Sequence, residues 1–388
     1  MNGDFHYYAT YSAAYLAGYT HEESEHIAYC ANLVDLCTRT FLRHINGPLS
    51  AATSQLQSEL AGARTDIIGL QDITRIWASF HFLPKDLYSK VEHVSKHYRD
   101  KYHLICGPNG DLLVDTVELA KGKGLEAIGL AMHVLADTWA HANFAGTPSL
   151  VINNTDYNFF ELREMEDGST KRIPISFGHN PVTKDDLDKG AYTGSLYQSS
   201  ERSIMNLGHG RAGHLPDYGF MKYEYVPAWA NYKPIIKDNP SDYFHAFSQM
   251  VYALQYLRGT IDTFEKDTYD TERIAQYEEK IKQIIRTRKT NCSEEWKQFG
   301  ESHSGQTIAP FTIETYEEEY LNATQEEKNN TVLGRFILAA LAQKSMVTNR
   351  VFASNNYLMG FSVDFKRYGF RGLKDFRALL NQKEDRNL

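Results

Sequence analysis

The pattern of hydrophobic and polar positions predicts a chain made mostly of helices. Its most apolar stretch is 124–146, GLEAIGLAMHVLADTWAHANFAG, in which apolar residues recur at helical spacing and predict one long buried helix. His133, Asp137 and His141 interrupt this surface at steps of four residues, which places them along one slowly drifting stripe. A charge inside an apolar helix is costly unless it is paired or bound to a metal. The stripe is therefore a candidate ligand set, with a hydrogen-bonded core network as the alternative.

Two more helices are predicted ahead of the central one. The first covers 4–19, and the second runs from Thr20 to about Leu42 and opens with a capping box between Thr20 and Glu23. Asp35 lies in this second helix among apolar residues, which makes it another candidate for a buried carboxylate.

His81 follows a strongly apolar run that begins at Asp66. Pro84 disfavours helix at the residue before it, so we expect His81 near a helix end or on the turn that follows. Taken alone, His81 is also explained as a core histidine that is satisfied by hydrogen bonds.

Residues after the central helix change character. Strand-forming residues flank Asp167-Gly168 and predict a β-hairpin. The stretch 206–219, NLGHGRAGHLPDYG, contains too many glycines for a regular helix, and its turn would bring His209, His214 and Asp217 together. That composition suits a metal site, but an irregular loop with histidines facing water explains it equally well.

The chain returns to helical patterns from residue 241. We therefore expect a mainly α protein, a multi-helix bundle with a small β-hairpin insertion around residues 150–200. Residues 1–240 would form a metal-binding helical domain, and residues 241–388 a C-terminal helical region packed on it. The basic tail from residue 365 is expected to be a solvated helix face, with a membrane or partner contact as the alternative.

Composition narrows the possible functions. The net charge of −8 over 388 residues argues against binding of duplex nucleic acid, which needs a basic face. No stretch approaches the ~20 apolar residues of a membrane span. The start of the chain lacks a basic segment followed by an apolar run, which predicts a cytoplasmic protein, although a specialised secretion system would leave no such trace. The four cysteines show no CxxC pair and are expected to be buried free thiols.

Candidate ligands occur in six segments of the chain. One such histidine or carboxylate in an apolar or Gly-rich setting is common in a protein core, whereas six together predict ligands that converge on a polynuclear metal site. The candidates are His6, Asp35, His81, His133 with Asp137, His141, and His209 with His214 and Asp217.

The order and local sequence of these segments resemble the zinc-dependent phospholipase C and P1 nuclease superfamily. His81-Phe82 resembles the family's His-Phe element, and His133-Val-Leu-Ala-Asp137 is similar to its His-x-x-x-Asp element. The resemblance covers roughly the first 220 residues, by short motifs. The chain is also similar to uncharacterised bacterial proteins that share the stretches DFHYY, HFLP and ADTWAH. The remaining elements would correspond as the early histidine (His6), the first aspartate (Asp35), the histidine after the aspartate (His141) and the late His/acid pair (His214 and Asp217).

The resemblance implies a helical protein with two or three zinc ions in a cleft. It implies hydrolysis of phosphoric esters by metal-activated water, on a phospholipid or small phosphodiester rather than on duplex DNA. Asp137 would then bridge two ions, and Asp35 would be a ligand or orient the water. Because the family also uses its first residue as a ligand, Asp4 or another group would have to replace it in a chain that begins with Met1.

Three alternatives stay open at this point. The helical body could be non-catalytic and hold a structural metal site, whose ligands would be saturated. It could be a single-strand nuclease like the P1 members of the superfamily. An HD-type phosphohydrolase is also built on histidine and aspartate, but it normally shows an adjacent His-Asp pair, which this sequence lacks.

Overall fold

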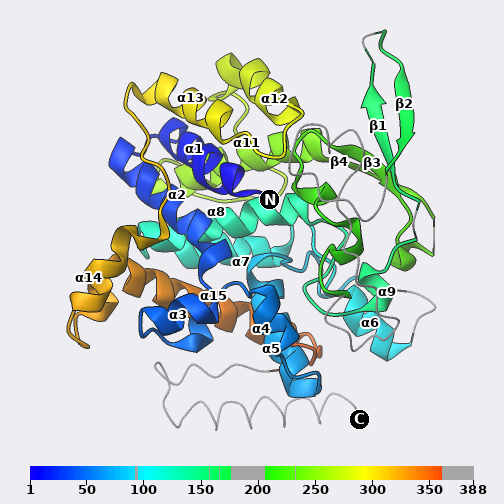
Figure 1. The fold of residues 1–388 in the computed structure, drawn as a ribbon, viewed down its shortest axis with the longest axis horizontal. Coiled ribbons are helices and arrows are strands. Elements are labelled where there is room, and N and C mark those ends of the chain that lie inside the picture. Colours follow the sequence, from blue (N-terminus) through cyan, green and yellow to red (C-terminus); the bar gives the residue numbers. More distant parts are fainter. Residues whose placement is uncertain (92–94, 157, 166, 176–205, 232, 361–388) are drawn as a thin grey trace.

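A computed structural model describes residues 1–91, 95–156, 158–165, 167–175, 206–231 and 233–360. The basic tail and residues 176–205, which include residues 176–200 of the expected insertion, lie outside this set. The described chain is mainly helical, as predicted, with a small antiparallel sheet at one side (Figure 1).

The helix α8 (Leu125–Ala140) runs through the middle of the helical body (Figure 1). It packs against α2 (His21–Leu36), α7 (Asp111–Ala120), α11 (Asn239–Arg258) and α15 (Val332–Ala353). All its residues from 126 to 140 are buried, which confirms the predicted buried helix. The apolar core around α8 takes residues from both halves of the chain, while the predicted division into two domains stays a prediction.

Both long predicted helices end earlier than their apolar patterns do. α8 ends at Ala140, so His141 is its C-terminal cap, and Asn143 then takes a positive φ of 80°. The helix from Thr20 has the predicted capping box but ends at Leu36. Thr38 then caps a separate helix by accepting a hydrogen bond from the Phe41 N–H. Apolar residues continue past both ends, so hydrophobic periodicity alone could not locate them.

The other described elements surround this body. The chain opens with a short π-helix, Phe5–Ala9, that leads into α1 (Thr10–Leu16), and α5 (Ile67–Phe80) delivers His81 as its cap. The remaining helices are α3 (Arg39–His44), α4 (Gln57–Ala61), α6 (Lys96–Tyr102), α9 (Leu150–Asn153), α12 (Glu278–Arg286), α13 (Ser293–Ser304) and α14 (Glu317–Asn322).

The sheet contains the predicted hairpin and two later strands. β1 (Phe160–Glu164) and β2 (Thr170–Pro174) pair across the turn that holds Gly168 at φ +80°. β3 (Lys222–Tyr225) and β4 (Ile235–Asp238) extend the sheet in the order β2-β1-β3-β4. The β region therefore reaches beyond residue 200, because the chain returns after the Gly-rich stretch to pair β3 with β1.

A second, smaller apolar core joins the sheet to the helical body. It includes Phe82, Phe144, Leu215 and Tyr225. Because Phe82 follows His81 and Leu215 follows His214, this core fixes the two segments that carry candidate ligands.

All four cysteines are free and buried, as expected. Within the described residues, no helix is both long enough and apolar enough to cross a membrane.

Candidate metal centre

Asp137 lies at the centre of the candidate site, in the last turn of α8. Its side chain is 1% exposed, and its two oxygens face different groups. Oδ2 lies 3.1 Å from His81 Nδ1 and 3.1 Å from His133 Nε2, while Oδ1 lies 3.2 Å from His6 Nε2. Asp35 completes what we call the Asp137 cluster, which comprises His6, Asp35, His81, His133 and Asp137.

A close contact between α2 and α8 brings these residues together. A Cβ at Gly129 would lie 2.4 Å from the backbone oxygen of Ile27, so only glycine allows the two helices to approach this far. At this separation His133 Nδ1 reaches the Ala31 carbonyl at 2.9 Å, and Asp35 of the same helix comes within 3.9 Å of His133 Nε2.

Four histidines of the site each direct one ring nitrogen at a backbone carbonyl. The pairs are His81 Nε2 with Thr53 O (2.9 Å), His133 Nδ1 with Ala31 O (2.9 Å), His141 Nδ1 with His81 O (2.7 Å) and His209 Nδ1 with Gly213 O (2.6 Å). A carbonyl oxygen can only accept, so each of these nitrogens carries the proton. In a neutral ring the other nitrogen is then a lone pair, and all four of these lone pairs face the acidic groups of the site.

Lone pairs that face carboxylate oxygens repel unless a proton or a metal ion lies between them. His81 Nδ1 and His133 Nε2 are 3.2 Å apart, and both face the same oxygen of Asp137. A backbone partner on the outer nitrogen is also what fixes the tautomer of a metal-bound histidine. The donor set therefore fits metal ions of the zinc type, which bind imidazole nitrogen and carboxylate oxygen.

His6 is the most isolated member of the Asp137 cluster. It is fully buried and stacks on the His133 ring at a centroid distance of 3.8 Å. Neither of its ring nitrogens has a hydrogen-bond partner among the described residues. Burial, reinforced by the nearby His133, lowers the pKa of His6 to about 4. Its Nε2 does lie 3.2 Å from Asp137 Oδ1, but a buried imidazole without a well-aligned hydrogen bond is costly, and a bound metal would satisfy it.

The second group, which we call the Asp217 cluster, comprises His141, His209, His214 and Asp217. Asp217 Oδ1 lies 3.3 Å from His141 Nε2, and Oδ2 lies 3.7 Å from His209 Nε2 and 3.3 Å from His214 Nδ1. Two short 3₁₀ turns, Gly210–Ala212 and Leu215–Asp217, shape this loop.

The amino group of Met1 lies between the two clusters. It donates a hydrogen bond to Asp137 Oδ1 at 2.5 Å and lies 3.6 Å from Asp217 Oδ1 and 3.3 Å from His141 Nε2. Burial alone would lower its pKa, but the charges of Asp137, Asp217 and Asp35 outweigh burial and raise the pKa to about 10. In this structure the ammonium supplies part of the positive charge that the two aspartates require.

The electrostatics of the site favour ionised carboxylates at Asp137 and Asp217 and neutral rings at His6 and His209. Burial would raise the pKa of Asp137, but the attraction of its ionised form to His141 and to the Met1 amine holds that pKa well below its usual range. The pKa of Asp217 is held low in the same way, chiefly by His209. Burial lowers the pKa of His209 to about 4. For His81, hydrogen bonding to Asp137 and the charge of Asp35 overcome burial and raise the pKa.

The site is open to solvent at both ends. The side chain of Asp35 is 36% exposed and lies 3.7 Å from His81 Nδ1, while the side chain of His214 is 47% exposed. Solvent can therefore reach the Asp35 carboxylate, while His81 and His133 beside it are buried.

The structure brings eight of the nine predicted ligands into three groups that could each hold a metal ion. These groups are His6/His133/Asp137, Asp35/His81/His133 and His141/His209/Asp217. The ninth residue, His214, lies beside Asp217 but outside these groups. His141 reaches the site from the cap of α8, and not from a helical stripe as expected.

The residue patterns of the sequence did not reveal two contributions to the site, the Met1 amine and the backbone carbonyls that orient the histidines. Asp4 does not enter the site, because its carboxylate accepts hydrogen bonds from the Cys292 and Phe5 N–H groups. The Met1 amine lies in the site instead, and only the resemblance pointed to the first residue of the chain. The Thr53 and Ala31 carbonyls that orient the histidines carry no signal in the sequence.

A family model matches the part of the chain that contains these residues. The chain belongs to DUF6765, a family of unknown function whose match covers residues 1–351. That range includes both clusters and almost all of α15. Comparisons with curated proteins and with solved structures found no match.

Proposed function

We propose that this chain is a zinc-dependent hydrolase of phosphoric esters, similar in its chemistry to phospholipase C. The observation that carries the proposal is the direction of the histidine lone pairs. Four imidazoles, each held by a backbone carbonyl, direct their second ring nitrogen at Asp137, Asp217 or a neighbouring ligand, and this arrangement favours bound cations.

The residues of the two clusters would have different roles in metal binding and in positioning water. Asp137 would hold two ions, because its two oxygens face different ligands, and the Asp217 cluster would hold a further ion. Bound zinc would supply a low pKa for water and positive charge against a phosphoryl transition state. Asp35 would bind or orient the attacking water, since its carboxylate is the partly exposed acid beside His81 and His133.

The main alternative is a structural metal site in a protein without catalytic activity. Structural zinc sites are closed by protein ligands, whereas catalytic sites keep an open position. The exposure of Asp35 supports the catalytic alternative, because it gives solvent a path to the ligands. The net charge of −8 favours a small phosphodiester or a phospholipid headgroup over duplex DNA.

The test is a hydrolysis assay on zinc-loaded protein with three substrates. These are p-nitrophenylphosphorylcholine, bis(p-nitrophenyl) phosphate and a single-stranded oligonucleotide. The proposal predicts zinc-dependent turnover of at least the first two, and loss of turnover in His133→Ala. His44→Ala, at a histidine with a 64% exposed side chain that pairs with Glu317, is the matched control and should keep full activity.

The substrates also separate the alternatives. Turnover of the oligonucleotide alone would favour a P1-like nuclease. Zinc bound tightly without turnover of any substrate would favour the structural site and contradict the proposed hydrolase.

A further inference from the structure

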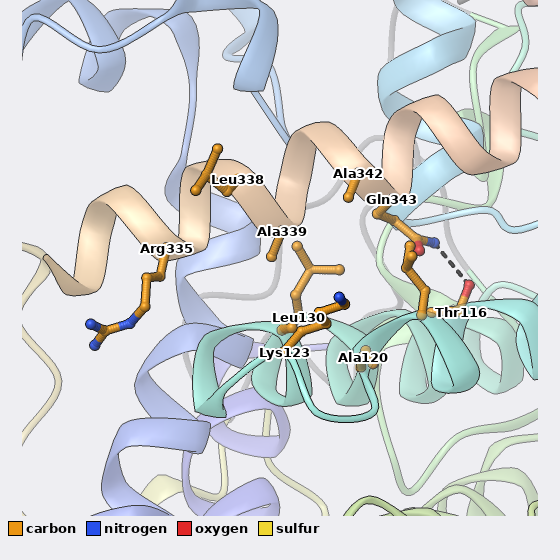
Figure 2. Close-up of a pocket in the computed structure, with 12 residues that line it drawn as sticks. Thr116, Ala120, Lys123, Leu130, Arg335, Leu338, Ala339, Ala342 and Gln343 are labelled. Atoms are coloured by element: carbon orange, nitrogen blue, oxygen red, sulfur yellow. Dashed lines mark hydrogen bonds between the residues drawn. The ribbon is translucent and has the colours of Figure 1, made fainter. Parts of the chain in front are cut away.

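A separate pocket lies between α15 and the helices α7 and α8, and none of the metal-cluster residues line it. Its volume is about 230 Å³. Figure 2 shows Lys123 beside Leu130 below α15, with Arg335 toward one end and a hydrogen bond between Gln343 and Thr116 toward the other. The apolar part of the wall comes from leucine and alanine side chains, among them Leu130, Leu338, Ala339 and Ala342.

The polar groups of the pocket are satisfied except for one cation. Arg335 pairs with the buried carboxylate of Glu126 at 2.6 Å. Gln343 donates to Thr116 Oγ1 at 2.9 Å and to the Ser79 carbonyl at 3.1 Å. No carboxylate among the described residues pairs with Lys123, which lies on the exposed turn between α7 and α8. The pocket therefore combines an apolar wall with a single uncompensated positive charge at its rim.

We propose that this pocket binds a single-chain carboxylate, such as a medium-chain fatty acid. The carboxylate would pair with Lys123 Nζ, and the hydrocarbon chain would lie along the apolar wall. The part of α15 that lines the pocket runs from Arg335 to Gln343, roughly 12 Å at the helical rise per residue. Apolar cavities of about 150 Å³ already take up benzene, so this one has room for a larger hydrocarbon group.

The charge pattern selects a monoanion. One unpaired ammonium matches one carboxylate, whereas a phosphate dianion usually meets an arginine fork or several backbone N–H groups. Here the guanidinium is already neutralised by Glu126. The proposal is independent of the hydrolase function, since it uses other residues and another face of the fold.

The first experiment is isothermal titration of the full chain with decanoate and with decanol. We expect saturable binding of decanoate, with affinity rising about fourfold for each methylene from octanoate to decanoate as apolar area is buried. Lys123→Ala should weaken decanoate about two- to fivefold, as expected for a partly exposed ion pair, and should leave decanol unchanged. Lys171→Ala, an exposed lysine on β2 at the far side of the molecule, is the matched control (Figure 1).

A second variant tests the apolar wall. Ala342 is exposed at the rim, so Ala342→Leu should fold and fill the space, and it should reduce binding of both ligands by at least tenfold. Absence of saturable decanoate binding would overturn the proposal. Binding that Ala342→Leu does not change, or a loss in Lys171→Ala equal to that in Lys123→Ala, would overturn it as well.

Discussion

The two clusters are built in different ways from the same ligand types. In the Asp137 cluster, each ligand stands on a helix or directly at a helix end, and every ligand except Asp35 is buried. In the Asp217 cluster, His209, His214 and Asp217 belong to a Gly-rich loop of short turns, and His214 is half exposed. We infer that the first cluster is preorganised by packing, while the second depends more on its own bound ion for order.

The largest expected effect comes from Asp137, because its two oxygens face three histidines of its cluster and the Met1 amine. Asp137→Asn keeps the shape of the side chain but removes the charge that faces His6, His81, His133 and the Met1 amine. We expect loss of more than one zinc equivalent and a fall in hydrolysis well beyond the about 100-fold typical of outer-shell changes. Zinc analysis and the phosphodiester assay measure both. Retention of all zinc would mean that Asp137 is not a bridging ligand.

Asp217→Asn should have a smaller and more local effect. Its carboxylate faces His141, His209 and His214, so the variant should lose one zinc equivalent and keep those of the Asp137 cluster. The measurement is zinc content per chain beside that of Asp137→Asn. Equal losses in the two variants would break the distinction between the clusters.

Lys344 on α15 does not itself belong to either cluster, but it should affect zinc binding by the Asp137 cluster alone. Lys344 Nζ donates to the Ser50 and Ala52 carbonyls at 2.7 and 2.6 Å, and the next carbonyl, of Thr53, holds His81. Lys344→Met should therefore loosen His81 and weaken zinc binding by up to about tenfold, at the lower end of outer-shell effects. Competition with a zinc chelator would detect the change. An equal weakening in the Asp217 cluster would contradict this path.

The metal-free protein should lose stability on acidification. His6 and His209 have pKa values of about 4 in the folded protein, against about 6.5 in the unfolded chain, so from pH 6.5 down to 4 the unfolded chain binds more protons. The raised pKa of His81 acts in the opposite sense, because its stabilisation is present below pH 6.5 and is lost as the pH rises through the folded value. With two groups against one, we expect a net loss of roughly 1–3 kcal/mol by pH 5.

Denaturant unfolding of chelator-treated protein at pH 7, 6 and 5 measures this change. One of the two lowered histidines belongs to each cluster, and His81 opposes them, so His209→Gln should remove more than half of the net pH dependence. Stability that increases toward pH 5 would contradict the assignment of neutral, buried histidines.

The smallest effect is expected for His214. It faces Asp217 at 3.3 Å, but its side chain is 47% exposed, and water can replace it. His214→Ala should keep the zinc content and change hydrolysis by less than about threefold, in the range of exposed charge pairs. Loss of a zinc equivalent in His214→Ala would move this residue into the ligand set.

The same contrast explains what the sequence could predict. The helix-borne ligands were found because polar residues in an apolar helical pattern are conspicuous, as for His133 and Asp137 on α8. The helix class, the hairpin and the His81 cap also follow from local patterns. His209 and Asp217 were suggested only by composition, because a Gly-rich loop has no periodicity that fixes where its side chains point.

What the sequence could not predict depends on tertiary contacts. The ends of α2 and α8 are set by caps and by positive-φ residues inside apolar stretches. The pairing of β3 with β1 depends on a long connection. The backbone carbonyls of Ala31, Thr53 and Gly213 decide which nitrogen of each histidine faces the site. Every residue has such a carbonyl, so the sequence cannot indicate which ones contact a histidine.

The central claim is that these histidines and aspartates hold metal ions, and elemental analysis of the purified protein after zinc loading and dialysis tests it most directly. The account predicts two or three zinc equivalents per chain, and loss of those held by the Asp137 cluster in His133→Ala, since His133 belongs to two of the three ligand groups. A folded, stable protein that retains no divalent metal would contradict it. In that case the clusters would be hydrogen-bonded core networks.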